Sequence, residues 1–287
     1  MQKKQGLLVL SGIIIVGLLY WLGPTDKKTM PNQSAILQKK TELFDIQSVI
    51  DSVTQALPDT VRTWADSTSK SIVSIANPSD KATRALDFAD QLIKNKNIDP
   101  ILGAYWASEA IKLDNSQKNL TFASQLMLTL LRNEHDERRL DWLTTETIAC
   151  FEQAIANDST NEDLKIGLGS CYLFGRGRNG DPQETMKGIQ QLLGVVRRDS
   201  NNMKAQLMLG IGGLISGQND KAITRLLKVV EQQPDNIEAV AFLADAYAAS
   251  GKNAEAIKWY EVSKRLVNNS AYTREADARI HELSRKP

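Results

Sequence analysis

The C-terminal part of this sequence repeats itself with a period of 34 residues, shown by the alignment of residues 203–236 on residues 237–270. Equivalent positions carry a bulky apolar residue, a turn glycine or a small residue. They pair as Leu209 with Leu243, Gly217 with Gly251 and Ala222 with Ala256. A period of this length is typical of stacked helical hairpins, because each hairpin buries its apolar face only against its neighbours. We therefore expect an all-α array that offers a binding surface.

The same register extends the array upstream to five hairpins over residues 79–270. The reference position is a small residue deep in the second helix of each hairpin. It is occupied by Ala110, Ala154, Val195, Val229 and Ser263, at intervals of 44, 41, 34 and 34 residues. The two longer intervals predict insertions, which we assign to charged or glycine-rich connections at residues 132–141 and 174–183. We expect these residues to lie in loops, since a helix lengthened within a hairpin would disturb the stack.

The landmarks of the last two units resemble those of the tetratricopeptide repeat. The last unit carries them at Leu243, Ala244, Tyr247, Gly251, Ala256 and Tyr260. The preceding unit keeps Leu209, Gly210, Gly217, Ala222 and Pro234. The resemblance implies a right-handed superhelical array that binds proteins or peptides. With its N-terminal apolar segment, the chain is also similar to membrane-anchored repeat proteins of the Bacteroidota.

Near the N-terminus, residues 6–22 form a run of seventeen residues without a charge, preceded by Lys3 and Lys4. A helix of this length is roughly 26 Å long, close to the hydrocarbon thickness of a bilayer. We expect a transmembrane anchor, with a cleaved signal peptide and a buried core helix as alternatives. A short cytoplasmic tail would place the rest of the chain in the periplasm, or in a lumen.

The chain is accordingly divided into six parts. They are a tail (1–5), an anchor (6–22), a linker (23–34), a helical spacer (35–78), the five hairpins (79–270) and a capping helix (271–287). Within the spacer, residues 35–57 carry an apolar stripe at helical spacing. This stripe predicts either packing on the first hairpin or self-association.

First helices line the concave face of such arrays, so the partner-binding residues are sought there. The candidates are Lys204, Leu207, Met208, Ile211, Leu214, Glu238, Phe242 and Asp245. The apolar members can receive a helix or an extended peptide, or they can pack against the third hairpin. Arg176 and Arg178 in the second insertion are further candidates, for contact with an acidic partner.

Other classes of function have little support in the sequence. Lysine and arginine number 35 against 34 aspartate and glutamate, a net charge of +1, which disfavours nucleic-acid binding. Residues 175–180 match G-x-G-x-x-G without the strand that a dinucleotide site requires. Cys150 and Cys171 have no metal-ligand spacing, although they lie on helices that a disulfide can join. We therefore expect no cofactor and no enzyme activity.

The expected function is that of a membrane-anchored scaffold or assembly factor that holds other proteins. Alternatives are an accessory factor in cytochrome c maturation or outer-membrane assembly, and an accessory subunit of an enzyme complex. In the last case His135 and His281 are the first groups to substitute.

Overall fold

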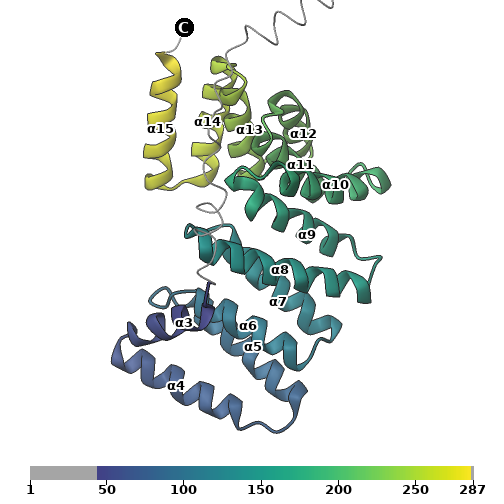
Figure 1. The fold of residues 1–287 in the computed structure, drawn as a ribbon. Coiled ribbons are helices and arrows are strands. Elements are labelled where there is room, and N and C mark those ends of the chain that lie inside the picture. Colours follow the sequence, from purple (N-terminus) through teal and green to yellow (C-terminus); the bar gives the residue numbers. More distant parts are fainter. Residues whose placement is uncertain (1–43, 286–287) are drawn as a thin grey trace, which may run out of the picture. The chain divides into compact units, whose positions relative to one another are not determined.

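Helices make up nearly all of the described chain, which comprises residues 44–285 of a computed structural model (Figure 1). This part holds thirteen α-helices and one 3-10 turn, and no strand. Two helices come first, α3 (Ile46–Gln55) and α4 (Asp59–Val73). Five hairpins follow: α5 (Pro78–Lys94) with α6 (Ile101–Leu113), α7 (Gln117–Leu131) with α8 (Glu137–Asn157), α9 (Glu162–Phe174) with α10 (Pro182–Arg198), α11 (Met203–Ile215) with α12 (Asn219–Gln232), and α13 (Ile237–Ala249) with α14 (Asn253–Val267). The turn η1 (Arg176–Asn179) joins α9 to α10, and α15 (Ser270–Ser284) is last.

Short polar side chains set where most of these helices begin. At each such start an Asp or Asn side chain accepts a hydrogen bond from a backbone N–H of the first turn, which satisfies a donor that has no partner within the helix. The capping residues are Asp45, Asn77, Asp136, Asn161, Asp181, Asn202, Asn236 and Asn269. At the turns of the last two hairpins, Gly217 and Gly251 have φ values of 71° and 75°. This left-handed conformation is the one that the sequence predicts for the turn glycines.

The reference position of the repeat register lies in the core of every hairpin. All five residues have no exposed surface: Ala110, Ala154, Val195, Val229 and Ser263. They lie on α6, α8, α10, α12 and α14, the second helices of the hairpins. In the fourth hairpin, a Cβ added to Gly210 would lie 2.6 Å from Cγ of Leu226 on the facing helix. The small residue is therefore needed for the close approach of α11 and α12.

First helices pack on first helices along the array. Helix α9 contacts both α7 and α11, and α11 contacts α13. The second helices make fewer contacts with one another, so the first helices lie on the inner side of the stack. Helices α9 and α11 are buried around most of their circumference.

The first insertion differs from the loop expected at residues 132–141, whereas the second forms most of the connection expected at residues 174–183. In the first, only residues 132–136 are loop, because Asp136 caps α8 and the remaining residues extend that helix to 21 residues. The added turn lies at the N-terminal end of α8, so it lengthens the helix without entering the middle of the hairpin. In the second insertion, Phe174 ends α9, η1 forms the connection and α10 begins at Pro182.

The two ends of the array are closed in different ways. Helix α3 packs on α6 and has one buried residue, Ile50, while α4 packs on α5. At the other end α15 packs on α14, with Ala276 and Leu283 buried. The expected tail, anchor, linker and first part of the spacer lie outside the described residues. Among residues 44–285, no helix is long and apolar enough to span a bilayer.

Candidate functional site

Three of the apolar residues expected on the concave face are part of the core. Leu207, Met208 and Ile211 on α11 are 7%, 7% and 2% exposed. Leu214 and Phe242 are half-buried and pack against the same core. The alternative in which this stripe packs within the array is therefore the one that the burial supports. These residues offer little surface to a partner.

The charged candidates of the same face already have partners within the chain. The Lys204 ammonium lies 2.9 Å from Asp163 of the preceding hairpin. Glu238 pairs with Arg132, and Asp245 accepts hydrogen bonds from Tyr260 and from Arg279 of α15. Burial, and then the hydrogen bond to Asp245, raise the pKa of Tyr260 to about 12.

The two arginines of the second insertion bind the first insertion. The Arg178 guanidinium donates to the carbonyl of Arg132 at 2.9 Å and to the carbonyl of Glu134. Arg176 lies 2.5 Å from the carboxylate of Asp141 and donates to Thr145 at 2.7 Å. The two insertions are thus joined by hydrogen bonds and an ion pair. Contact of these arginines with an acidic partner stays a prediction, and it would compete with these bonds.

The groove that the structure does present lies nearer the middle of the array. It is a hollow of about 450 Å³ between the first helices α7, α9 and α11, and we call it the inner groove. Its lining is mixed in polarity and comprises Thr121, Gln125, Leu128, Asn161, Asp163, Leu164, Ile166, Gly167, Ser170 and Lys204. Of the expected partner-binding residues, only Lys204 belongs to it.

The lining residues follow helical spacing, which explains how they come together. Thr121, Gln125 and Leu128 lie on one face of α7, while Ile166 and Ser170 lie one turn apart on α9. The walls carry exposed polar groups, and the floor is formed by nearly buried side chains such as Ser170, which is 4% exposed. Such a groove suits an extended segment that offers both polar and apolar groups.

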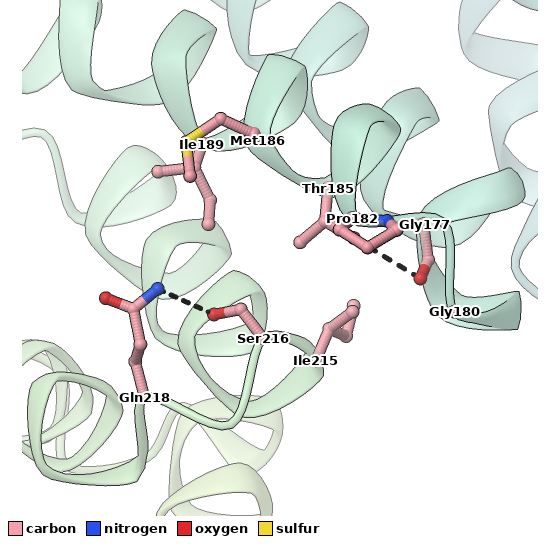
Figure 2. Close-up of a pocket in the computed structure, with 9 residues that line it drawn as sticks. All are labelled: Gly177, Gly180, Pro182, Thr185, Met186, Ile189, Ile215, Ser216 and Gln218. Atoms are coloured by element: carbon pink, nitrogen blue, oxygen red, sulfur yellow. Dashed lines mark hydrogen bonds between the residues drawn. The ribbon is translucent and has the colours of Figure 1, made fainter. Parts of the chain in front are cut away.

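A second hollow of about 350 Å³ lies where η1, α10 and the end of α11 meet (Figure 2). Met186 and Ile189 approach it from α10 and Ile215 from α11, as Figure 2 shows. Its polar groups are used locally: Thr185 donates to the carbonyl of Gly177 at 3.3 Å, and Gln218 donates to Ser216 at 3.0 Å. It is thus mainly an apolar surface, on which Met186 is 48% exposed.

The two cysteines are not joined by a disulfide. Cys150 and Cys171 are both free and buried. Within residues 44–285, no three His, Cys, Asp or Glu side chains gather as metal ligands. Residues 175–180, which include η1, lie in the connection from helix α9 to helix α10, with no strand before them. In helix α3, the apolar residues Ile46, Val49 and Val53 pack against the array. Self-association through residues 35–57 stays a prediction.

Comparison with known proteins identifies the type of fold. Residues 214–276 match the family model of the tetratricopeptide repeat. No curated protein sequence matches the chain. The solved structure of TTC0263, a thermophilic tetratricopeptide protein of Thermus thermophilus, is similar with a TM-score of 0.53 and 16% identity, over 70% of this chain and 98% of that one. At this identity the likeness shows the fold alone.

Two further solved structures are less similar. MamA has a TM-score of 0.45 and 20% identity, over 66% of this chain and 93% of its own. YrrB, described as a tetratricopeptide protein with an unusual peptide-binding site, has a TM-score of 0.43 and 18% identity, over 75% of this chain and 99% of its own. The described helices form an all-α array of the tetratricopeptide type, in which residues 214–276 carry the repeat's own sequence pattern.

Proposed function

We propose that this protein is a scaffold that binds a segment of another protein in its inner groove. The observation that carries the proposal is the hollow of about 450 Å³ between α7, α9 and α11, three first helices from consecutive hairpins. Tetratricopeptide arrays bind proteins or peptides, and an extended segment can contact several hairpins at once. This assignment moves the expected site from α11 and α13 toward the middle of the array.

The proposal is tested by placing a photoreactive residue in the groove. Gln125 is exposed and lines the groove, whereas Gln153 is an exposed glutamine on the second helix α8 of the same hairpin. Photoreactive substitution at Gln125 is expected to give specific products with cell extract, and substitution at Gln153 is expected to give none of them. Identical products at both positions would reject the groove as the site.

A blocking variant then separates groove binding from chance proximity. Thr121→Trp places a large side chain in the groove one turn from Gln125, while Thr224→Trp changes an exposed threonine of α12. We expect the Gln125 products to disappear with Thr121→Trp and to persist with Thr224→Trp. Products that survive the first substitution would come from contacts outside the groove.

We further propose that residues 6–22 hold this scaffold at a membrane, with the repeat array in the periplasm. The support is the uncharged run of seventeen residues behind Lys3 and Lys4. Deletion of residues 6–22 is expected to move the protein from the membrane fraction to the soluble fraction. N-terminal sequencing of the membrane-bound protein distinguishes the anchor from a cleaved signal peptide, since cleavage removes these residues. Protection of the array from protease added outside intact cells, and its loss after outer-membrane disruption, tests the compartment.

A further inference from the structure

One ion pair connects parts of the array that are not neighbours. Arg132 follows α7 of the second hairpin, and Glu238 lies in the first turn of α13 of the fifth hairpin. They are 106 residues apart in sequence, and the Arg132 guanidinium donates to the Glu238 carboxylate. In stacked repeats each unit normally contacts only the units next to it. This contact passes over hairpins three and four.

The ion pair lies in line with the inner groove. Arg132, the residue after α7, follows Leu128 of the groove wall by one helical turn, and on α9 Phe174 follows Ser170 of the floor by one turn. The Arg132 guanidinium lies 4.4 Å above the centre of the Phe174 ring. It therefore covers the Phe174 ring, one turn beyond the groove lining, while it reaches across to Glu238.

Both partners are held in place by their own surroundings. The carbonyl of Arg132 accepts the hydrogen bond from Arg178, so the second insertion fixes the main chain from which this side chain extends. Glu238 follows the helix cap Asn236, which accepts from the N–H of Ala239 at 3.0 Å. The charged ends themselves are more accessible, with side chains 37% and 33% exposed. A pair with this exposure is weakened by salt and is broken at low cost.

We propose that Arg132 and Glu238 form a clasp that regulates access to the inner groove. When the pair is closed, it covers Phe174 and closes this end of the groove. When the pair breaks, the Phe174 ring becomes accessible and the groove lengthens by one turn of α7 and α9. The regulatory role rests on the groove being the binding site proposed above. The crosslinking and thiol-labelling tests of the clasp use no partner, so its failure is distinguishable from a failure of that proposal.

The proximity of the two positions is tested by a short bis-maleimide on the full-length protein with Arg132→Cys and Glu238→Cys. The natural thiols of Cys150 and Cys171 are buried and do not compete. The control pairs Glu238→Cys with Lys118→Cys, since Lys118 lies on α7 about 21 Å from Arg132 along the helix. We expect an intramolecular crosslink in the first variant that is absent from the second. Equal yields in the two variants would show that positions 132 and 238 are not neighbours in the array, and a clasp between them would then be ruled out.

Regulation is tested by the rate at which a thiol at position 174 reacts with an uncharged maleimide. The rate in Phe174→Cys is expected to rise about three- to tenfold when Glu238→Gln is added, because the open state becomes more populated. Salt should accelerate the reaction while Glu238 is present and have little effect after Glu238→Gln. Phe122→Cys on the exposed side of α7 is the matched control, since Phe122 is 43% exposed. The thiol at position 122 should react at the same rate with and without Glu238→Gln and at every salt concentration. Equal rates at position 174 with and without Glu238→Gln would overturn the proposal.

The two proposals fail in different experiments. If Gln125 gives no specific photoproducts while positions 132 and 238 still crosslink, the binding site is rejected and the contact between Arg132 and Glu238 is retained. Photoproducts at Gln125 whose yield is the same with Glu238→Gln would keep the binding site and reject the regulation.

Discussion

A missing side chain decides how closely the helices of the first hairpin approach. A Cβ added to Gly103 on α6 would lie 2.6 Å from the backbone oxygen of Ala89 on α5. Gly194 on α10 has no atom within 4 Å of the same added carbon. Alanine substitution at Gly103 therefore tests how tightly two helices pack, whereas alanine substitution at Gly194 tests helix propensity alone.

We expect Gly103→Ala to lower the free energy of unfolding by about 1–3 kcal/mol, because the backbones must move apart. Gly194→Ala should raise it by about 0.5–1 kcal/mol, since alanine favours the helix and nothing opposes it. Urea titration of the three proteins measures both changes. A stabilised Gly103→Ala protein would show that α5 and α6 are less tightly packed than the structure has them.

The buried thiols provide a second test at single residues. Burial, and then the charge of Glu146, raise the pKa of Cys150 to about 12, and burial raises the pKa of Cys171 well above its usual value. Since the thiolate is the reactive form, we expect neither cysteine to react with a thiol reagent at pH 8 until the protein unfolds.

The same shift makes stability depend on pH. Folding favours the neutral thiol, so the stabilisation is complete below the ordinary thiol pKa of about 8.5 and is lost as the pH rises toward 12. The fall in urea midpoint between pH 8 and pH 10.5 should therefore be smaller in Cys150→Ala than in the natural protein. An equal fall in both would assign the pH dependence to other groups.

Among the connecting elements, the two insertions stabilise each other through Arg178. Its guanidinium is the hydrogen-bond donor to two backbone carbonyls of the α7–α8 connection. Arg178→Ala leaves those carbonyls without this donor and should cost about 1–3 kcal/mol of unfolding free energy. Hydrogen exchange should accelerate at residues 132–136 in particular.

Arg138→Ala is the matched control for this element. Arg138 is exposed in the first turn of α8, so its removal should change the free energy of unfolding by less than about 0.5 kcal/mol. If both variants behave alike, the contact between the insertions contributes nothing measurable.

At the level of the whole array, the two end helices should differ in importance. Helix α15 is held by the buried Ala276 and Leu283 and by the Arg279–Asp245 pair at 2.6 Å, whereas Ile50 is the one buried residue of α3. Deleting residues 269–287 exposes the surface around Tyr260 and should lower both the urea midpoint and solubility. Deleting residues 44–56 should change the midpoint less. The reverse order would mean that α3 caps the array more firmly than α15.

Local rules account for the parts of the fold that the sequence predicts well. Gly217 and Gly251 mark turns because a positive φ favours glycine, and the buried residue of each second helix recurs because two helices cross there. The start of α8 at Asp136 was also readable, since an aspartate before a charged helical turn is a typical cap. The loop predicted at residues 132–141 is therefore too long, because α8 begins at Glu137.

The binding surface was less predictable, for a physical reason. Leu207 and Met208 are buried because the neighbouring hairpins pack over them, and that packing depends on how tightly successive hairpins curve. The pairing of Arg132 with Glu238 likewise depends on the summed geometry of four hairpins. Single-sequence periodicity reports which face of a helix is apolar, and it does not report what covers that face.

The contact between Arg132 and Glu238 also has a consequence for folding kinetics. Its 106-residue separation means that it forms only after the intervening hairpins are stacked, so it should be absent from the folding transition state. Glu238→Gln should then leave the refolding rate unchanged and have its small effect on the unfolding rate, as measured by the two arms of a stopped-flow chevron. An array that otherwise assembles from neighbour to neighbour would thereby acquire one late contact that prolongs the life of the native state.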